Sequence, residues 1–495
     1  MYSMDDFNTY YDEIDEELIQ AYLNGETMDP ELEAFLASYQ KDYDQEYEEV
    51  ASLSLLELGE SCMLPVLTGA LKVLLPLLAL SFLFKLVSNL WKPDGGDTGI
   101  PRSFLHLTSA LFGVLALHLV FSRDLVYVLY CCCLIYLTLL AVHVLHRQYC
   151  GIAVSTIVVV YIIVCELYLV EETTWHKVRG AQIIMAMKVI GLAFDVASGA
   201  EQMPSMSEYL GYVLCVGTVI FGPWISFQDY KNMLSQDHKS MNMGWLFCVA
   251  KSAAVSLACM VYSTCLLTNW LVPSSSYKWI LAYRDAQSFR FSHYFVSFAS
   301  ETSALLCGLR GSFYKENESR WSVTKPQHIE VPRSLVEVVT YWNLPMHYWL
   351  KTYVFKPSRI FGTFVAVILT YAASSLLHGL NFQLAAVLFS LGFYSYVEFV
   401  FRNKLSRIFS ACIQAKRCPD DCGHDYKSYH PLVLLTNVCF GLLALFHLAY
   451  LGLMFDSSRE QDKGYTMKHT LEKWANLDYA SHWVVLGTYI FYLII

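Results

Sequence analysis

The chain has 495 residues, of which 55% are hydrophobic and only 16% are charged, and its mean hydropathy is +0.38. A typical soluble domain is about 25% charged, so this composition excludes an ordinary soluble protein. Several nearly uncharged stretches are long enough to cross a hydrocarbon core roughly 30 Å thick. A β-barrel would instead show short segments of alternating hydrophobicity. The composition predicts an all-α, polytopic membrane protein.

The formal charge of −10 is divided unevenly along the chain. Residues 1–60 hold 18 acidic residues and one basic residue, Lys41. The whole chain has 44 acidic and 34 basic residues, so the remaining chain holds 26 acidic and 33 basic residues. The acidic composition predicts a largely disordered N-terminal tail over residues 1–60 and a membrane-embedded domain over residues 61–495. The acidic start lacks the features of a signal peptide, so the first spanning helix is expected to direct insertion.

The expected spans follow the apolar stretches in chain order. Two further segments, Ala181–Val196 and Ala286–Leu309, are apolar but carry charges, and each could span, re-enter or lie in the interface. The count is therefore ten to twelve. The ten clearer spans are Met63–Leu90, Phe104–Phe121, Val126–Leu145, Ile152–Leu169, Tyr209–Phe227, Trp245–Val272, Ile360–Leu377, Leu384–Phe401, Leu432–Phe455 and Trp483–Ile495.

Most of the 15 cysteines lie in apolar runs and are expected to be small buried hydrophobic residues rather than a disulfide framework. Cys418, Cys422 and His424 lie on a polar loop between two apolar runs. Two thiols and an imidazole could bind zinc, but a fourth ligand is not evident. Free thiols and no metal are therefore predicted. The loop begins with basic residues, which favours the cytoplasmic side of the membrane.

His378 is the strongest functional candidate because it stands between two apolar runs and is followed by Gly379. An ionisable residue in a membrane segment is costly, usually faces a cavity, and is a functional candidate by default. A histidine can take up a proton near neutral pH. The alternative is a core histidine that hydrogen-bonds to a neighbouring helix, and this residue alone leaves the two readings equally weighted.

Asn343 lies in a run of interfacial aromatic residues just before Pro345. A carboxamide there could orient an imidazole or donate to a developing oxyanion. Alternatively, Asn343 merely caps a helix that begins at the proline. A third segment, Trp175 to Gln182, opens an amphipathic stretch with Lys177 and Arg179, which suits phosphate binding or a snorkelling membrane anchor.

These motifs together resemble the membrane-bound O-acyltransferase family from about residue 50 to the C-terminus. The resemblance rests on Trp175–Gln182, Val219–Phe227, Trp342–Met346 and Ser375–Gly379. It is closest to the members that transfer palmitoleate from palmitoleoyl-coenzyme A to a serine of Wnt proteins in the endoplasmic reticulum membrane. The resemblance implies a helical bundle of about 10–12 membrane segments with an internal tunnel.

The resemblance also implies roles for individual residues. His378 would be the general base, and Asn343 would orient the reactants or stabilise the oxyanion. No cofactor is expected, since acyl-coenzyme A is a co-substrate; the expected partners are palmitoleoyl-coenzyme A, Wnt proteins and membrane lipids, and not nucleic acid. The residues expected to contact the substrates are Trp342, Tyr371, Ser375, Lys177, Arg179 and Arg333.

Three other functions remain open at this point. The chain could be a transporter with His378 as a proton relay. However, the charged residues within the clear spans do not mark a shared proton path; they are Lys85, Glu166, Lys251 and Glu398. It could be a member of the same family that acylates a lipid. It could also be an inactive scaffold of the same fold, against which the presence of both His378 and Asn343 argues.

Overall fold

The computed structural model describes residues 54–90, 101–234, 241–272, 277–309, 322–419, 421–455 and 467–495. Within these ranges the chain is built of helices, and the one β-type pairing is an isolated bridge between Ala411 and Tyr426. The all-α prediction is therefore confirmed. Most of the acidic tail, residues 1–53, lies outside the described residues. Residues 55–60 are helical, and Ser54 and Glu57 form a capping box at the start of the first helix.

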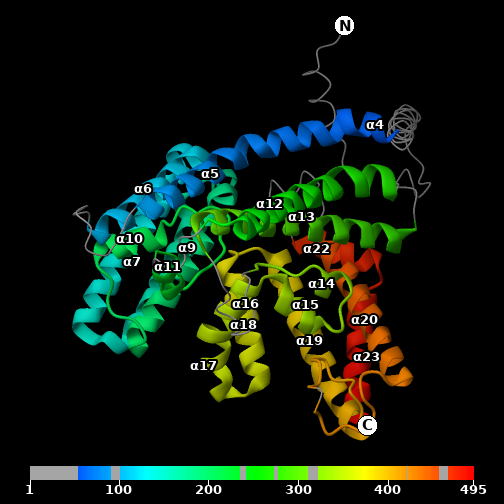
Figure 1. Ribbon diagram of the computed structural model, residues 1–495. Coiled ribbons are helices and arrows are strands. Elements are labelled where there is room, and N and C mark those ends of the chain that lie inside the picture. The colour runs from blue at the N-terminus through cyan, green and yellow to red at the C-terminus, as the bar shows by residue number, and fades with distance from the viewer. Residues whose placement is uncertain are drawn as a thin grey trace, which may run out of the picture.

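The helices form two groups that are joined by one long helix (Figure 1). The N-terminal group holds α4 (Leu55–Leu58), α5 (Leu64–Leu90), α6 (Arg102–Phe121), α7 (Leu125–His146), α8 (Cys150–Val164), α9 (Glu172–Ser198), α10 (Met206–Val213) and α11 (Phe227–Leu234). Then α12 (Met243–Val261) packs along α13 (Lys278–Cys307), which also contacts both α5 and α20.

The C-terminal group of helices lies below α13 in the view of Figure 1. Short helices precede the two long antiparallel segments that flank His378. The group holds α14 (Gln327–Glu330), α15 (Leu335–Trp342), α16 (Leu344–Leu350), α17 (Lys356–Ser358), α18 (Thr363–Leu377), α19 (Phe382–Ile408), α20 (Pro431–Gly452), α22 (Met467–Asn476) and α23 (Ala480–Ile494).

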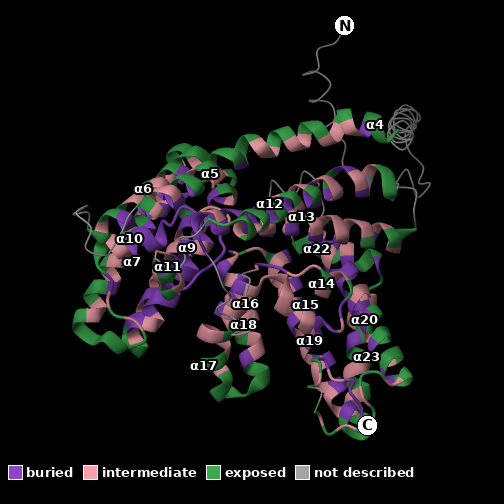
Figure 2. Ribbon diagram, viewed as in Figure 1, coloured by how far each residue is buried: buried purple, intermediate pink, exposed green. Residues whose placement is uncertain are grey.

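Six stretches of the described chain are long and apolar enough to cross a membrane. One of them, Arg102–Leu169, contains α6, α7 and α8 in succession. The helices α18 and α23 are apolar but shorter. Much of the apolar surface on these helices is exposed (Figure 2), as expected for a protein whose outer face meets lipid. The expectation of a polytopic membrane protein is confirmed, while the internal tunnel stays a prediction.

The predicted span Tyr209–Phe227 is wrong. Only Met206–Val213 is helical, and the chain then runs without regular structure to Phe227. Pro223 lacks a main-chain N–H, and Gly222 adopts a φ of +78°, so neither residue continues a helix. A non-helical segment at membrane depth is tolerated only where protein surrounds it. Nearly all of residues 209–227 are buried, which meets that condition.

Lys188 satisfies the main chain where α10 ends. Its ammonium donates to the carbonyl oxygens of Tyr212 and Val213 at 3.1 and 3.2 Å and to Thr218 Oγ1 at 2.7 Å. Lys188 itself is fully buried within α9. The charge of Lys188, which made the membrane placement of Ala181–Val196 uncertain from the sequence, thus serves as a structural hydrogen-bond donor. The segment is part of one continuous, mostly buried helix.

A disulfide joins Cys62 to Cys265 across 203 residues of sequence. Among the other described cysteines all are free thiols, most of them buried, as predicted. The expectation of no disulfide was wrong at this one pair, because the two cysteines lie in separate apolar runs and their sequence positions carry no sign of the approach. The bond ties the segment before α5 to the segment after α12.

Candidate active site

His378 ends helix α18. Its main-chain N–H donates to the carbonyl oxygens of Ser375 and Ser374 at 3.0 and 3.3 Å, which closes the last turn of the helix. Ser375, a predicted substrate contact, is buried one turn before the histidine. Its main-chain carbonyl oxygen accepts one of these hydrogen bonds. The His378 ring makes no hydrogen bond with any other described residue. Its nitrogens are therefore open to an incoming group.

The turn after His378 is held from a distant helix. Gly379 has a φ of +92°, a conformation that favours glycine. Leu380 N then donates to both carboxylate oxygens of Glu166 at 3.0 Å. Glu166 belongs to the last turns of the α8 segment, so this contact joins His378 to the N-terminal group of helices. A carboxylate in an apolar span is thereby used to position the turn.

Asn343 separates α15 from α16. Its Oδ1 accepts a hydrogen bond from Met346 N at 3.0 Å, and Pro345 stands in the first turn of α16. The helix-cap alternative is therefore confirmed for the side-chain oxygen. The Nδ2 group makes no hydrogen bond with the described residues and remains able to donate to a ligand. Trp349 fixes the other end of α16, since its Nε1 donates to Met187 O in α9 at 2.8 Å.

His293 enters the site beside Asn343. Its ring stacks on Trp342 with centroids 4.6 Å apart and planes 20° apart. The Nε2 atom of His293 is buried and has no hydrogen-bond partner in the described chain. Such a buried, unpaired nitrogen is costly unless a ligand or water meets it. Trp342, a predicted substrate contact, is thus packed against a second histidine.

Electrostatic contact links these groups to His378. His293 and Arg179 lie close enough to His378 to act on it electrostatically, and Glu166 acts in the same way on Arg179. Helices α16 and α18 are in contact, which brings the capped Asn343 segment to the helix that ends at His378. The structure therefore gathers residues from α8, α9, α13, α16 and α18 around one histidine.

The remaining predicted residues have surroundings or partners of their own. Tyr371 packs between α18 and α19, where a Cβ on Gly392 would lie 2.6 Å from its ring. Lys177 is exposed on α9. Arg333 is used elsewhere, because its guanidinium donates to Cys412 O at 2.7 Å and Gln414 O at 3.2 Å. Of the predicted basic residues, Arg179 alone is brought close to His378.

Sequence reasoning missed Glu166 and His293 as members of the site. Both stood out as ionisable residues within or beside apolar runs, which is the signal that singled out His378. The sequence could not predict which way the two side chains point. The structure shows that Glu166 faces the Gly379 turn and that His293 faces Trp342.

The comparisons with known proteins identify the family of the chain. The model of the MBOAT, membrane-bound O-acyltransferase family matches residues 62–414. Protein-serine O-palmitoleoyltransferase porcupine of Homo sapiens is 42% identical over 464 residues, which cover 89% of this chain and 97% of that protein. The enzyme of the same name from Anopheles gambiae is 34% identical, covering 90% of this chain and 94% of that protein.

A more distant relative acts on a different acceptor. Lysophospholipid acyltransferase 1 of Arabidopsis thaliana is 25% identical over 280 residues, which cover 48% of this chain and 61% of that protein. The family match spans most of the chain and includes His378, Asn343, Glu166 and His293. The chain therefore belongs to the membrane-bound O-acyltransferase family.

Proposed function

We propose that this protein transfers palmitoleate from palmitoleoyl-coenzyme A to a serine hydroxyl of a Wnt protein. The observation that carries the proposal is the open His378 ring at the end of an apolar helix. Asn343, whose Nδ2 is free to donate, begins α16, which contacts that helix. The relatives named protein-serine O-palmitoleoyltransferase support the choice of acyl group and acceptor, because they align along nearly their whole length.

In the proposed reaction, His378 removes the proton of the serine hydroxyl as the serine oxygen attacks the thioester carbonyl carbon. The carbonyl oxygen becomes an oxyanion, and Asn343 Nδ2 donates a hydrogen bond to it. The carbon–sulfur bond then breaks, and the protonated His378 returns the proton to the departing coenzyme A sulfur. The products are an O-acyl serine ester and free coenzyme A.

We place this chemistry in the endoplasmic reticulum membrane, with the two substrates arriving from opposite sides. The Cys62–Cys265 disulfide lies near α4, at the top of Figure 1, and supports an oxidising, luminal environment there. The loop between α19 and α20 lies at the bottom and carries basic residues, which supports a cytosolic environment. Arg179 is the basic residue best placed to meet the charged part of acyl-coenzyme A.

The transporter alternative loses support, because three of the four charges named in the spans have local partners or face outward. Glu166 holds the turn after His378. Glu398 accepts from Arg402 Nη1 at 2.9 Å and from Leu335 N at 2.7 Å. Lys251 is exposed. These residues do not line a common path, which a proton relay requires.

The proposal is tested with purified protein, palmitoleoyl-coenzyme A and a serine-bearing peptide from a Wnt protein. We expect a peptide heavier by one palmitoleoyl group, and no change in a matched peptide with alanine at that serine. A parallel reaction offers a lysophospholipid as acceptor. Acylation of the lipid without acylation of the peptide would favour the lipid-acceptor alternative, and transfer to neither would contradict both.

A further inference from the structure

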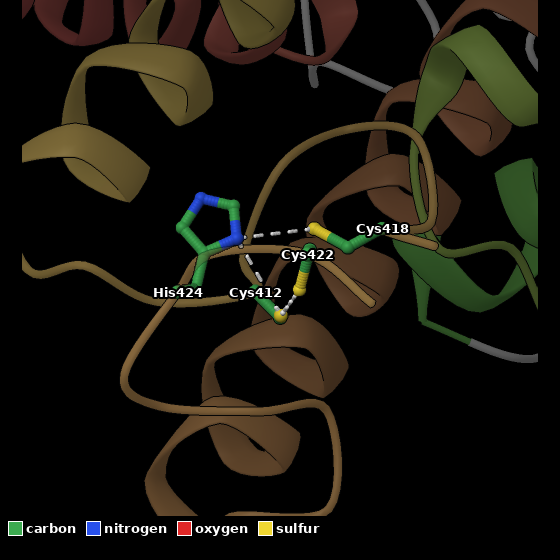
Figure 3. A group of neighbouring side chains, drawn as sticks. All are labelled: Cys412, Cys418, Cys422 and His424. Atoms are coloured by element: carbon green, nitrogen blue, oxygen red, sulfur yellow. Dashed lines mark hydrogen bonds between the residues drawn. The ribbon is translucent and has the colours of Figure 1, made fainter. Parts of the chain in front are cut away.

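The loop between α19 and α20, residues 409–430, folds three cysteines and one histidine into one cluster. Figure 3 shows the side chains of Cys412, Cys418, Cys422 and His424 converging on a common point. Their potential ligand atoms all lie within 4.8 Å of one another. We propose that these four residues bind one structural zinc ion.

The distances agree with a tetrahedral site. Zn–S bonds of about 2.3 Å and Zn–N bonds of about 2.0 Å place the ligand atoms of a tetrahedron roughly 3.5 to 3.8 Å apart. His424 Nδ1 lies 3.7 Å from both the Cys412 and Cys418 sulfurs, and the Cys412 and Cys422 sulfurs are 3.3 Å apart. Three thiolates and one imidazole form a closed ligand set, the type that structural zinc sites use.

A hydrogen-bond chain sets the tautomer of His424. Ser406 Oγ donates its single proton to Ala411 O at 2.7 Å and lies 3.0 Å from His424 Nε2. The serine oxygen must therefore accept from Nε2, so the ring proton is on Nε2. The lone pair is then on Nδ1, which faces the sulfurs. Orientation of a ligating histidine through its other nitrogen is the usual arrangement at metal sites.

The loop has only a small apolar core of its own. Its buried apolar cluster consists of Ala411, Cys412, Ile413 and Val433, with two of the proposed ligands packed against it. A core this small rarely stabilises a fold without a metal or a disulfide. The single bridge between Ala411 and Tyr426 is the loop's only β-type pairing among the described residues.

The metal would also stabilise the segment that carries Asn343. Arg402, in α19, donates to Ile413 O at 2.7 Å and to Arg333 O at 2.6 Å, while Arg333 donates to Cys412 O at 2.7 Å. Ser334, the N-cap of α15, donates to Ala415 O at 2.9 Å. The loop main chain is therefore clamped to the start of α15, the helix that ends next to Asn343.

Sequence reasoning predicted no metal because only three ligands lay close together. Cys412 supplies the fourth from the start of the loop, four residues after α19 ends at Ile408. Three of the four residues lie beyond residue 414, where the match to the family model ends. Thiolate ligands also fit the cytosolic side proposed for this loop, since thiols stay reduced there.

The first test measures metal in the intact protein purified without added zinc or chelator. We expect about one zinc per chain by mass spectrometry of the elements, released when a mercurial reagent titrates the thiols. Exchange with Co²⁺ should produce the visible absorption of a tetrahedral thiolate complex. A disulfide between Cys412 and Cys422, detected by peptide mass in protein that lacks zinc, would overturn the proposal.

Variants separate metal binding from folding. Cys422→Ser should reduce bound zinc at least about tenfold, whereas His424→Cys, which keeps four ligands, should retain it. Cys439→Ser is the matched control, since Cys439 is a free, exposed cysteine outside the cluster. If Cys422→Ser does not fold, the His424→Cys variant and the mercurial titration still decide the question. Equal zinc contents in wild type, Cys422→Ser and Cys439→Ser would also overturn the proposal.

Discussion

The Glu166 carboxylate lies directly against Gly379, the residue after His378. A Cβ at position 379 would lie 2.7 and 2.8 Å from the two Glu166 oxygens, closer than real Cβ contacts allow. The same oxygens accept a hydrogen bond from Leu380 N. The position of the proposed catalytic histidine thus depends on a glycine that leaves room for a carboxylate from another helix.

Gly379→Ala is therefore expected to reduce acyl transfer strongly. The alanine must adopt a positive φ, at a cost of about 1–2 kcal/mol, and must also displace Glu166. Gly362→Ala is the matched control, because Gly362 begins the same helix with a φ of +96° and has nothing within 4 Å of its Cβ position. Peptide acylation should fall at least about tenfold more in Gly379→Ala than in Gly362→Ala. Equal losses would show that backbone strain alone matters.

Asn343→Asp separates the cap from the proposed oxyanion donor. Aspartate keeps the Oδ1 acceptor for Met346 N but removes the Nδ2 donor, so the melting temperature should hold while turnover falls by about 10²-fold. Asn343→Ala should lose turnover and also about 1 kcal/mol of stability.

Asn242→Asp provides the matched control for the Asn343 variants. Asn242 is exposed and caps α12 through a hydrogen bond from Trp245 N at 2.8 Å. This variant should keep both its stability and its turnover. Normal turnover in Asn343→Asp would contradict the donor role and leave Asn343 as a helix cap.

Lys188→Met should destabilise the protein more than any surface lysine variant. The change removes the donor for the Tyr212 and Val213 carbonyl oxygens and leaves them buried without it, at a cost of about 1–3 kcal/mol each. Lys177→Met in the same helix is the control, since Lys177 is exposed. Thermal unfolding of the detergent-purified variants is the measurement. A melting temperature equal to that of Lys177→Met would show that the irregular segment does not need this ammonium.

Cys62→Ser and Cys265→Ser should lower the melting temperature equally, and the double variant should fall no further, because each change removes the same bond. Reduction of the wild-type protein should reproduce the shift. The Cys133→Ser variant, at an exposed free thiol, should leave it unchanged. Additive losses in the double variant would show that the two residues are not bonded to each other.

The sequence predicted most of the fold because apolar length and periodicity determine membrane helices. It also singled out His378 and Asn343 as candidate site residues, since polar groups are conspicuous in apolar surroundings. It failed at Tyr209–Phe227, where composition resembles a span but Lys188 supports an irregular chain. It could not assign Arg333 to the Cys412 loop or find the Cys62–Cys265 bond, because both depend on approaches between residues far apart in sequence.

The central claim is that His378 acts as the base in acyl transfer to serine. The most direct measurement is single-turnover transfer from bound palmitoleoyl-coenzyme A to the serine peptide, normalised to the amount of bound donor. The account predicts that His378→Ala binds the donor normally but transfers at least about 10²-fold more slowly, whereas the exposed-histidine control His118→Ala transfers at the wild-type rate. Normal transfer by folded His378→Ala protein would contradict the account.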